Sequence, residues 1–236
     1  MTDPLAPLKQ AVHAANLALH RSGLVLYTFG NVSGIHRERR VLVIKPSGVA
    51  YEDLTPEDMV PVSLDTGEVL GGRLRPSSDT PTHLVLYRAF ERAGGIAHTH
   101  SEYATTFAQA RAAIRCMGTT HADSFRGDVP PTRPLTAEEI ASDYEANTGH
   151  AIVETFRSLG LDPAEVPAVL VSSHGPFAWG ADAAQAVENA VVLEHLARME
   201  FELRVLAPDA PRPSQALVDK HFARKHGKAA YYGQER

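Results

Sequence analysis

The interpretation of this chain depends on the stretch Gly95-Ile96-Ala97-His98-Thr99-His100-Ser101. A short run of β-forming residues ends there in two histidines separated by one residue. Side chains two positions apart on a strand project from the same face, so His98 and His100 can direct both imidazole rings at one point. Two converging imidazoles are typical of a metal site. Two half-buried histidines on a polar sheet face would give the same motif, so the motif alone leaves both explanations open.

Two other segments supply further potential ligands. Asp79 lies in Pro76-Ser77-Ser78-Asp79-Thr80, and His174 lies in Val171-Ser172-Ser173-His174-Gly175-Pro176. Small residues beside both side chains let the backbone approach a bound group closely. We therefore expect His98, His100 and His174 to form a three-histidine metal site. Asp79 would be a fourth ligand or an adjacent base.

The pattern on either side of these motifs predicts an α/β fold. A helix, the pair Gly94-Gly95, the strand at 96–100 and a second helix follow one another, which places both histidines at the carboxyl end of a strand. Short β-rich runs predict the other strands, at 24–29, 32–36, 41–44, 59–64, 68–70, 116–120, 168–172 and 177–180. Apolar periodicity and capping signals predict helices at 3–22, 79–92, 104–113, 136–159, 182–206 and 214–225, the fourth of them weakened at 147–150.

Length and composition exclude several classes of protein. With 236 residues, 44% of them hydrophobic, the chain can bury a full core, which favours one α/β domain over residues 1–236. A formal net charge of -5 argues against nucleic acid as a primary partner. The single cysteine, Cys116, is typical of a reducing compartment, and no segment has the pattern of a signal peptide or a membrane span. We expect a soluble, cytoplasmic protein with neither a nucleic-acid nor a membrane partner.

Three loops carry groups that can bind an anion. Gly30-Asn31 offers backbone N–H groups and an amide, and Lys45-Pro46-Ser47-Gly48 adds a cation and a hydroxyl. Together with Ser77-Ser78 these loops predict a nest for a phosphate group. Each loop taken alone is more typical of an ordinary turn than of a binding site. The chain has no glycine fingerprint of a nucleotide-binding protein, so a nucleotide is not indicated.

Several motifs, taken in order, resemble the class II aldolase/adducin family, and the similarity runs nearly end to end. The motifs are Gly30-Asn31-Val32-Ser33, Lys45-Pro46-Ser47-Gly48, Ser77-Ser78-Asp79-Thr80-Pro81-Thr82-His83, His98-Thr99-His100-Ser101, Ser173-His174-Gly175-Pro176-Phe177 and the tail Lys225 to Gln234. The resemblance implies a three-layer α/β/α fold with a central mixed, mainly antiparallel sheet. It also implies a homotetramer with cyclic four-fold symmetry and active sites at subunit interfaces.

The resemblance further implies a role for each matching residue. His98, His100 and His174 would bind zinc, with Asp79 beside them. Asp123 and Tyr232 would be the acid/base pair, and Tyr232 would come from the adjacent subunit. The residues that would hold the substrate, largely by its phosphate, are Gly30, Asn31, Lys45, Ser47, Gly48, Ser77 and Ser78. Manganese or cobalt remains an alternative to zinc, because imidazole ligands suit all three ions.

The implied activity is a metal-dependent epimerisation that interconverts L-ribulose 5-phosphate and D-xylulose 5-phosphate, with a place in arabinose catabolism. Carbon 4 is not adjacent to the carbonyl, so direct deprotonation there is difficult. Retro-aldol cleavage of the C3–C4 bond and its re-formation on the opposite face would invert that carbon. The first alternative is a class II aldolase of the fuculose- or rhamnulose-1-phosphate type. Such aldolases typically carry Glu where Asp79 stands. The second is an adducin-like structural protein, which would lack the metal-binding histidines.

Overall fold

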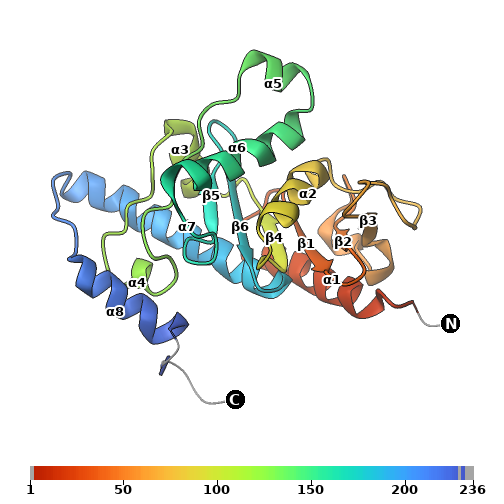
Figure 1. Cartoon of the computed structure of the whole chain (residues 1–236), viewed down its shortest axis with the longest axis horizontal. Coiled ribbons are helices and arrows are strands. Elements are labelled where there is room, and N and C mark those ends of the chain that lie inside the picture. Colours follow the sequence, from red (N-terminus) through yellow and green to blue (C-terminus); the bar gives the residue numbers. More distant parts are fainter. Residues whose placement is uncertain (1–2, 228–229, 232–236) are drawn as a thin grey trace.

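A six-stranded sheet forms the centre of the computed structural model, which describes residues 3–227 and 230–231 (Figure 1). The strands are β1 Asn31–His36, β2 Val41–Ile44, β3 Val60–Ser63, β4 Gly95–His98, β5 Ala168–Leu170 and β6 Pro176–Gly180. Their order is β3-β2-β1-β4-β6-β5, and every pairing between these strands is antiparallel. A parallel element is present as a single bridge between Pro131 and Leu170.

Eight α-helices in the described residues surround the sheet (Figure 1). They are α1 Ala6–Arg21, α2 Thr80–Ala89, α3 Glu102–Ala110, α4 Thr119–Ala122, α5 Ala137–Ala141, α6 Tyr144–Leu159, α7 Ala183–Leu206 and α8 Gln215–His226. Two short 3₁₀ helices, η1 Tyr51–Asp53 and η2 Pro56–Asp58, lie between β2 and β3. Within the described residues, no helix is both long and apolar enough to cross a bilayer.

The helices form a layer on each face of the sheet, as neighbouring residues of β1 illustrate. Gly34 faces Leu8 and Val12 of α1, and α7 packs beside α1 on the same face. Ser33 points the other way, and its hydroxyl bonds to His83 and Tyr87 of α2, which packs on α6. Side chains alternate between the faces of a strand, so the strand is buried on both. The predicted three-layer α/β fold is confirmed.

Several helix starts were predictable because their capping groups lie close by in the sequence. The Thr136 hydroxyl accepts a hydrogen bond from the Glu139 N–H, and the Glu139 carboxylate accepts one from the Thr136 N–H, forming a capping box. Asp182 caps α7 through the Gln185 N–H, and Ser214 caps α8 through the Leu217 N–H. All three helices begin where these residues predict.

Two predicted strands were wrong. Residues 24–29 form a turn in which the Phe29 N–H bonds to the Leu26 carbonyl, and Tyr27 has a φ of 52°. A left-handed residue cannot continue a strand, so this β-prone run finds no partner in the sheet. Residues 116–118 lead into α4, which already includes 119 and 120, and the Cys116 N–H bonds to the Asp128 carboxylate rather than to a neighbouring strand.

Several boundaries also differ from the prediction; α3, for example, spans Glu102–Ala110 rather than 104–113. Helix α1 begins at Ala6 rather than at Asp3, whose carboxylate accepts the Leu5 N–H one turn earlier. The second strand of the predicted hairpin at 59–70 is reduced to one isolated bridge, between Val62 of β3 and Val69. The break in the fourth helix falls at Ser142-Asp143, not at 147–150, because the Asn147 amide bonds to the Glu139 carbonyl and the Ser142 hydroxyl.

The start of β4 lies in direct backbone contact with the connection between β6 and α7. The Gly94 N–H donates to the Gly180 carbonyl at 2.7 Å. A methyl group on Gly95 would collide with the backbone of Asp182 and Ala183. Only a residue without Cβ fits there, because the atoms that a methyl group would meet are backbone atoms, which cannot shift as the end of a flexible side chain can.

We expect Gly95→Ala to lower the free energy of unfolding by about 2 kcal/mol, the usual cost of overpacking a core. Thermal unfolding followed by circular dichroism measures the loss. Gly118→Ala is the matched control, because nothing lies within 4 Å of a methyl group at that position. Equal melting temperatures for the two variants would contradict the predicted collision.

Candidate active site

The imidazole rings of His98, His100 and His174 converge, as their sequence positions predict. One nitrogen from each ring lies within 4.8 Å of the other two. The Nε2 atoms of His98 and His100 are 3.1 Å apart, and the three ring centroids are separated by 4.8 to 5.0 Å. Strand β4 ends at His98, so His100 lies just beyond it and reaches the cluster from the following loop. Three imidazoles at this spacing fit a divalent metal ion.

The buried member of the cluster is held in the state that a ligand needs. The His98 Nδ1–H donates to the Pro176 carbonyl at 2.9 Å, because a carbonyl can only accept. In the neutral ring this leaves the Nε2 lone pair for a metal. Phe177, paired with His98 across β4 and β6, stacks on its ring at 4.2 Å. The sheet therefore fixes both the tautomer and the plane of His98.

The electrostatics of the cluster also suit a cation. Burial, followed by the neighbouring His98 and His100, lowers the pKa of His174 to about 4. Burial and His98 likewise lower the pKa of His100. Both rings are neutral near pH 7 and present lone pairs rather than positive charge.

Asp79 lies beside the cluster but is not one of the residues whose ligand atoms meet within 4.8 Å. Its carboxylate accepts a hydrogen bond from the Asn31 amide at 2.7 Å. Burial raises the pKa of Asp79, but His98, His83 and the Asn31 hydrogen bond outweigh that effect and hold it below its ordinary value. Asp79 is therefore an ionised group next to the three histidines.

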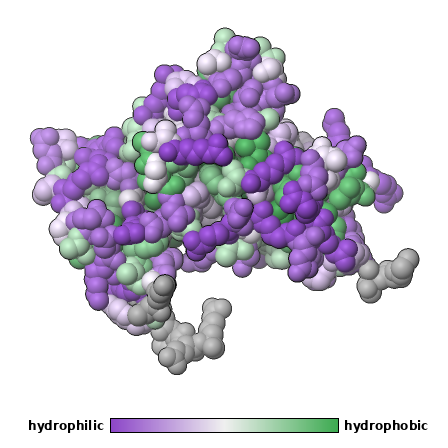
Figure 2. All heavy atoms as spheres, viewed as in Figure 1, coloured by the Kyte–Doolittle hydropathy of each residue, from purple (hydrophilic) through white to green (hydrophobic). Residues whose placement is uncertain are grey.

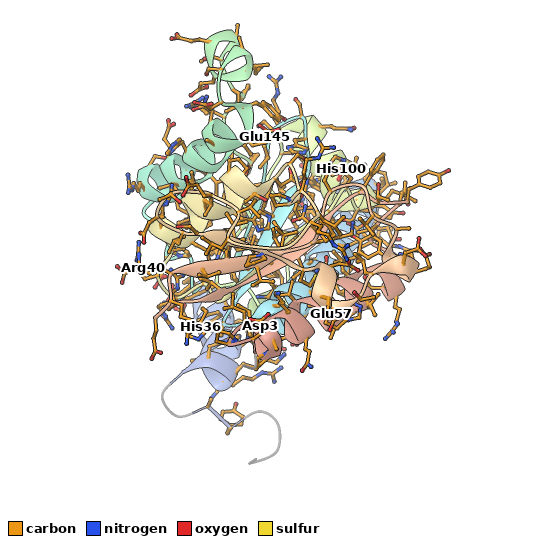
Figure 3. The ribbon with its side chains drawn as sticks, turned by 90° about the vertical axis from the view of Figure 1, so that its right-hand side faces the viewer. Asp3, His36, Arg40, Glu57, His100 and Glu145 are labelled. Atoms are coloured by element: carbon orange, nitrogen blue, oxygen red, sulfur yellow. The ribbon has the colours of Figure 1, made fainter. Side chains whose placement is uncertain are left out.

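A cavity of about 410 Å³ opens in front of the histidines and brings most of the predicted site residues together. In Figure 3, two of its lining residues, His100 and Glu145, are labelled. The predicted residues that line it are Gly30, Asn31, Lys45, Ser47, Gly48, Ser77, Ser78, Asp79, His98, His100 and His174. Figure 2 shows the face seen in Figure 1, where patches of apolar residues lie among polar ones.

Backbone hydrogen bonds join two of the three anion-binding loops. The Ser47 N–H donates to the Arg75 carbonyl, and the Ser77 N–H donates to the Lys45 carbonyl, both at 3.0 Å. The Asn31 amide connects the third loop, because it donates to Ser77 at 3.1 Å as well as to Asp79. Segments about 45 residues apart thus form one wall of the cavity.

Lys45 is a buried cation within this wall, with 1% of its surface exposed. Its ammonium donates to the Val49 carbonyl at 2.7 Å and to the Pro46 carbonyl at 3.3 Å. Burial lowers the pKa of Lys45 to about 8, so the group is still charged at neutral pH. A buried ammonium whose hydrogen bonds go to carbonyl oxygens keeps its positive charge uncompensated, which suits the binding of an anion.

Asp123 does not line this cavity in its own chain. It follows α4 and faces α8, where Arg224 and His221 bind its carboxylate at 2.5 to 3.0 Å. Burial raises the pKa of Asp123, but the hydrogen bonds from Arg224 and His221 outweigh it, so its pKa lies below the ordinary value. Tyr232, the other predicted acid/base residue, lies outside the described residues.

Five residues that line the cavity were not among the predicted site residues: Thr28, Phe29 and Pro46, which adjoin predicted loop residues, and Tyr144 and Glu145, which come from a different segment. The Tyr144 hydroxyl lies 3.5 Å from Nδ1 of His174. Tyr144 and Glu145 belong to the first turn of α6, and the break before it directs them at the cavity. The capping box at Thr136 predicts only where this helical region begins. The break that directs Tyr144 and Glu145 at the cavity depends on the Asn147 amide, which bonds back to the Glu139 carbonyl.

Comparison with known proteins gives close and nearly full-length relatives. L-ribulose-5-phosphate 4-epimerase UlaF of Salmonella paratyphi A is 54% identical over 228 residues, which covers 97% of this chain and 99% of the relative. The protein of the same name from Salmonella typhi matches equally well.

Solved structures share the fold at much lower sequence identity. An L-fuculose 1-phosphate aldolase superposes with a TM-score of 0.77 at 23% identity, covering 94% of this chain and 96% of that one. YgbL of Escherichia coli, described as a putative aldolase/epimerase/decarboxylase, gives a TM-score of 0.72 at 23% identity, covering 92% and 99%. The family described as Class II Aldolase and Adducin N-terminal domain matches residues 10–201. With this match and the 54% identity, the chain belongs to the class II aldolase/adducin family.

Proposed function

We propose that this chain is an isomerase that interconverts L-ribulose 5-phosphate and D-xylulose 5-phosphate, the activity of an L-ribulose-5-phosphate 4-epimerase. One observation carries the proposal. The three-histidine cluster and the anion-binding loops line a single cavity, in a chain that is 54% identical over nearly its full length to proteins of that name. We further propose that residues 1–236 act as one catalytic domain and that the single buried cysteine, Cys116, reflects a cytoplasmic location. Supply of the substrate by arabinose catabolism stays a prediction.

The loops would hold the substrate by its phosphate. Lys45 supplies the positive charge, and Ser47, Ser77 and Ser78 supply hydroxyl groups at the cavity wall. Backbone N–H groups of the Gly30 and Gly48 loops would add neutral donors, as in other phosphate nests. An anchored phosphate keeps the two-carbon fragment in the cavity after C3–C4 cleavage, so that its carbonyl can rotate before the bond forms again.

The three histidines would hold a divalent metal ion, which we propose to be zinc. The ligand set fits, because His98 is fixed with a free Nε2 and the other two rings are neutral. When bound, the metal supplies Lewis-acid stabilisation of the negative charge that develops on the substrate. Asp79, held by Asn31, would add an ionised carboxylate beside the ion, either as a ligand or as a base.

Proton transfer at the C4 oxygen would need one group on each face of the substrate, and we assign it to Asp123 and Tyr232. Because Asp123 faces α8 and not the cavity of its own chain, we propose that it serves the cavity of a neighbouring subunit. Its lowered pKa keeps the Asp123 carboxylate ionised at neutral pH, which is the form that can accept a proton. The assembly would be a homotetramer with cyclic symmetry, in which exposed apolar side chains of α7, such as Phe201 and Leu206, become buried.

A product assay with L-ribulose 5-phosphate on the zinc-loaded protein tests the proposed function. D-xylulose 5-phosphate and free glycolaldehyde phosphate would be measured together. Xylulose phosphate formed without free fragments, and abolished by a chelator, is the expected result. Release of fragments, or cleavage of a 1-phosphate ketose instead, would reassign the chain to the aldolases.

The charge of Lys45 should make phosphate binding depend on pH. Its pKa near 8 means that the ammonium loses its proton as the pH rises, while a phosphate monoester stays doubly charged above pH 7. We expect the KM to rise about tenfold between pH 7 and pH 9, as for a single group titrating near 8. Lys45→Met should show a high KM with no such dependence. A wild-type KM that is flat over this range would remove the charge of Lys45 from substrate binding.

A further inference from the structure

Tyr51, in η1, is one of the largest fully buried side chains and lies beneath the anion-binding wall. Its hydroxyl donates to the Gly30 carbonyl at 3.0 Å and is shared with the Phe29 carbonyl at 3.2 Å. Its ring lies under the Lys45 ammonium, 4.7 Å from the ring centroid. One side chain thus contacts two segments of the wall that are not neighbours in the sequence.

The first contact sets the position of the Gly30 loop. Gly30 has a φ of 78°, and a methyl group there would lie 2.7 Å from the His98 carbonyl and 2.9 Å from a Val25 methyl. The Gly30 loop therefore lies so close to the end of β4 that no side chain fits between them. The Tyr51 hydroxyl donates to the carbonyl groups on both sides of the Phe29–Gly30 junction, so it holds the loop at this close approach.

The second contact stabilises the charge of Lys45. The face of a phenol ring carries partial negative charge and attracts an ammonium above it. The Lys45 hydrogen bonds of the described structure go only to carbonyl oxygens, so this ring is a further favourable contact for the cation. The Tyr51 ring is itself held by His20 of α1, stacked at 4.9 Å and nearly parallel.

We propose that Tyr51 is a positioning residue that holds the Gly30 loop and the Lys45 ammonium in one fixed arrangement for a phosphate group. It does not line the cavity, so it acts through these two segments and not on the substrate itself. The inference rests on the proposed function for the identity of the phosphorylated substrate. The binding measurement itself needs only inorganic phosphate, whatever the sugar of the substrate is.

Tyr51→Phe tests the hydroxyl, because it keeps the ring and removes the bonds to the two carbonyls. Inorganic phosphate would be titrated into the zinc-loaded protein by calorimetry at pH 7. We expect the dissociation constant to rise about three- to tenfold, the effect of one lost hydrogen bond. The KM for L-ribulose 5-phosphate should rise by the same factor, with kcat changed by less than about twofold. Tyr51→Leu also removes the ring from Lys45 and should weaken phosphate binding further.

Tyr87→Phe is the matched control. Tyr87 is equally buried and also loses a hydroxyl hydrogen bond, to Ser33 at 2.8 Å, but it contacts neither Gly30 nor Lys45. Phosphate affinity should be unchanged in this variant even where stability falls. Wild-type phosphate affinity in Tyr51→Phe, or an equal loss in Tyr87→Phe, overturns the inference. If Tyr51→Leu does not fold, the phenylalanine variant decides alone.

The outcome is separable from that of the proposed function. If the wild-type protein binds phosphate, fails to epimerise the sugar and loses phosphate affinity in Tyr51→Phe, the function falls and the inference stands. If it epimerises the sugar and Tyr51→Phe has an unchanged KM, the inference falls and the function stands.

Discussion

His98→Asn should abolish both metal binding and turnover. Asparagine keeps a polar side chain in the strand but removes the Nε2 lone pair, and with it the only buried ligand of the cluster. Loss of the Lewis acid should lower kcat/KM by at least about a thousandfold, since several kcal/mol of transition-state stabilisation disappear. Elemental analysis would measure zinc against protein in the same samples used for kinetics.

His150→Asn is the control for this experiment, because His150 is exposed on α6 and away from the cluster. It should retain metal and activity. A His98→Asn protein that keeps a full complement of zinc would remove His98 from the metal site. Replacement of zinc by manganese or cobalt in the wild-type protein would identify which ion supports turnover.

Asp123→Asn should slow epimerisation by about a hundred- to ten-thousandfold while zinc content stays unchanged, the usual range for a lost general base. The amide has the shape of the carboxylate but cannot accept a proton at neutral pH. Asp219→Asn is the matched control, because Asp219 also pairs with an arginine, Arg126, on an exposed part of α8. Normal turnover by Asp123→Asn would end its assignment as the base.

Mixed oligomers decide which cavity Asp123 serves. Asp123→Asn chains and His98→Asn chains are each expected to be inactive alone. If Asp123 acts on the neighbouring cavity, random co-assembly in equal amounts should restore about a quarter of the sites, those with an intact cavity next to an intact Asp123. If both residues act within one chain, no site in the mixture is intact and activity stays at the level of the single variants.

The sequence predicted this fold and site well wherever the decisive contacts are local. Helices α5, α7 and α8 begin at caps three residues from the N–H groups that they bind. His98 and His100 are separated by one residue, so they lie close together even though β4 ends at His98 and His100 belongs to the following loop. The family resemblance then predicted that these separate motifs contribute to one site, and most of them line one cavity.

Features that depend on distant partners were not predictable. Residues 24–29 have strand-forming composition, but a strand needs a neighbour to bond, and β1 is already paired on both sides by β2 and β4. Asp123 is held by residues about a hundred positions away in α8. The entry of Tyr144 into the cavity depends on a side chain of α6 that bonds back across a helix break. Each of these outcomes follows from tertiary contacts that no short window of sequence contains.

The backbone contact at Gly94 and Gly95 fixes where the three-histidine cluster lies but does not determine what the cluster binds. Strand β4 has only four residues, so it is a stiff rod about 13 Å long. One end is fixed against the β6–α7 connection and the other carries His98. A side chain is excluded at the fixed end, whereas the other end carries side chains that face the cavity. Side chains around the cavity can therefore differ while the three-histidine cluster keeps its position in the fold.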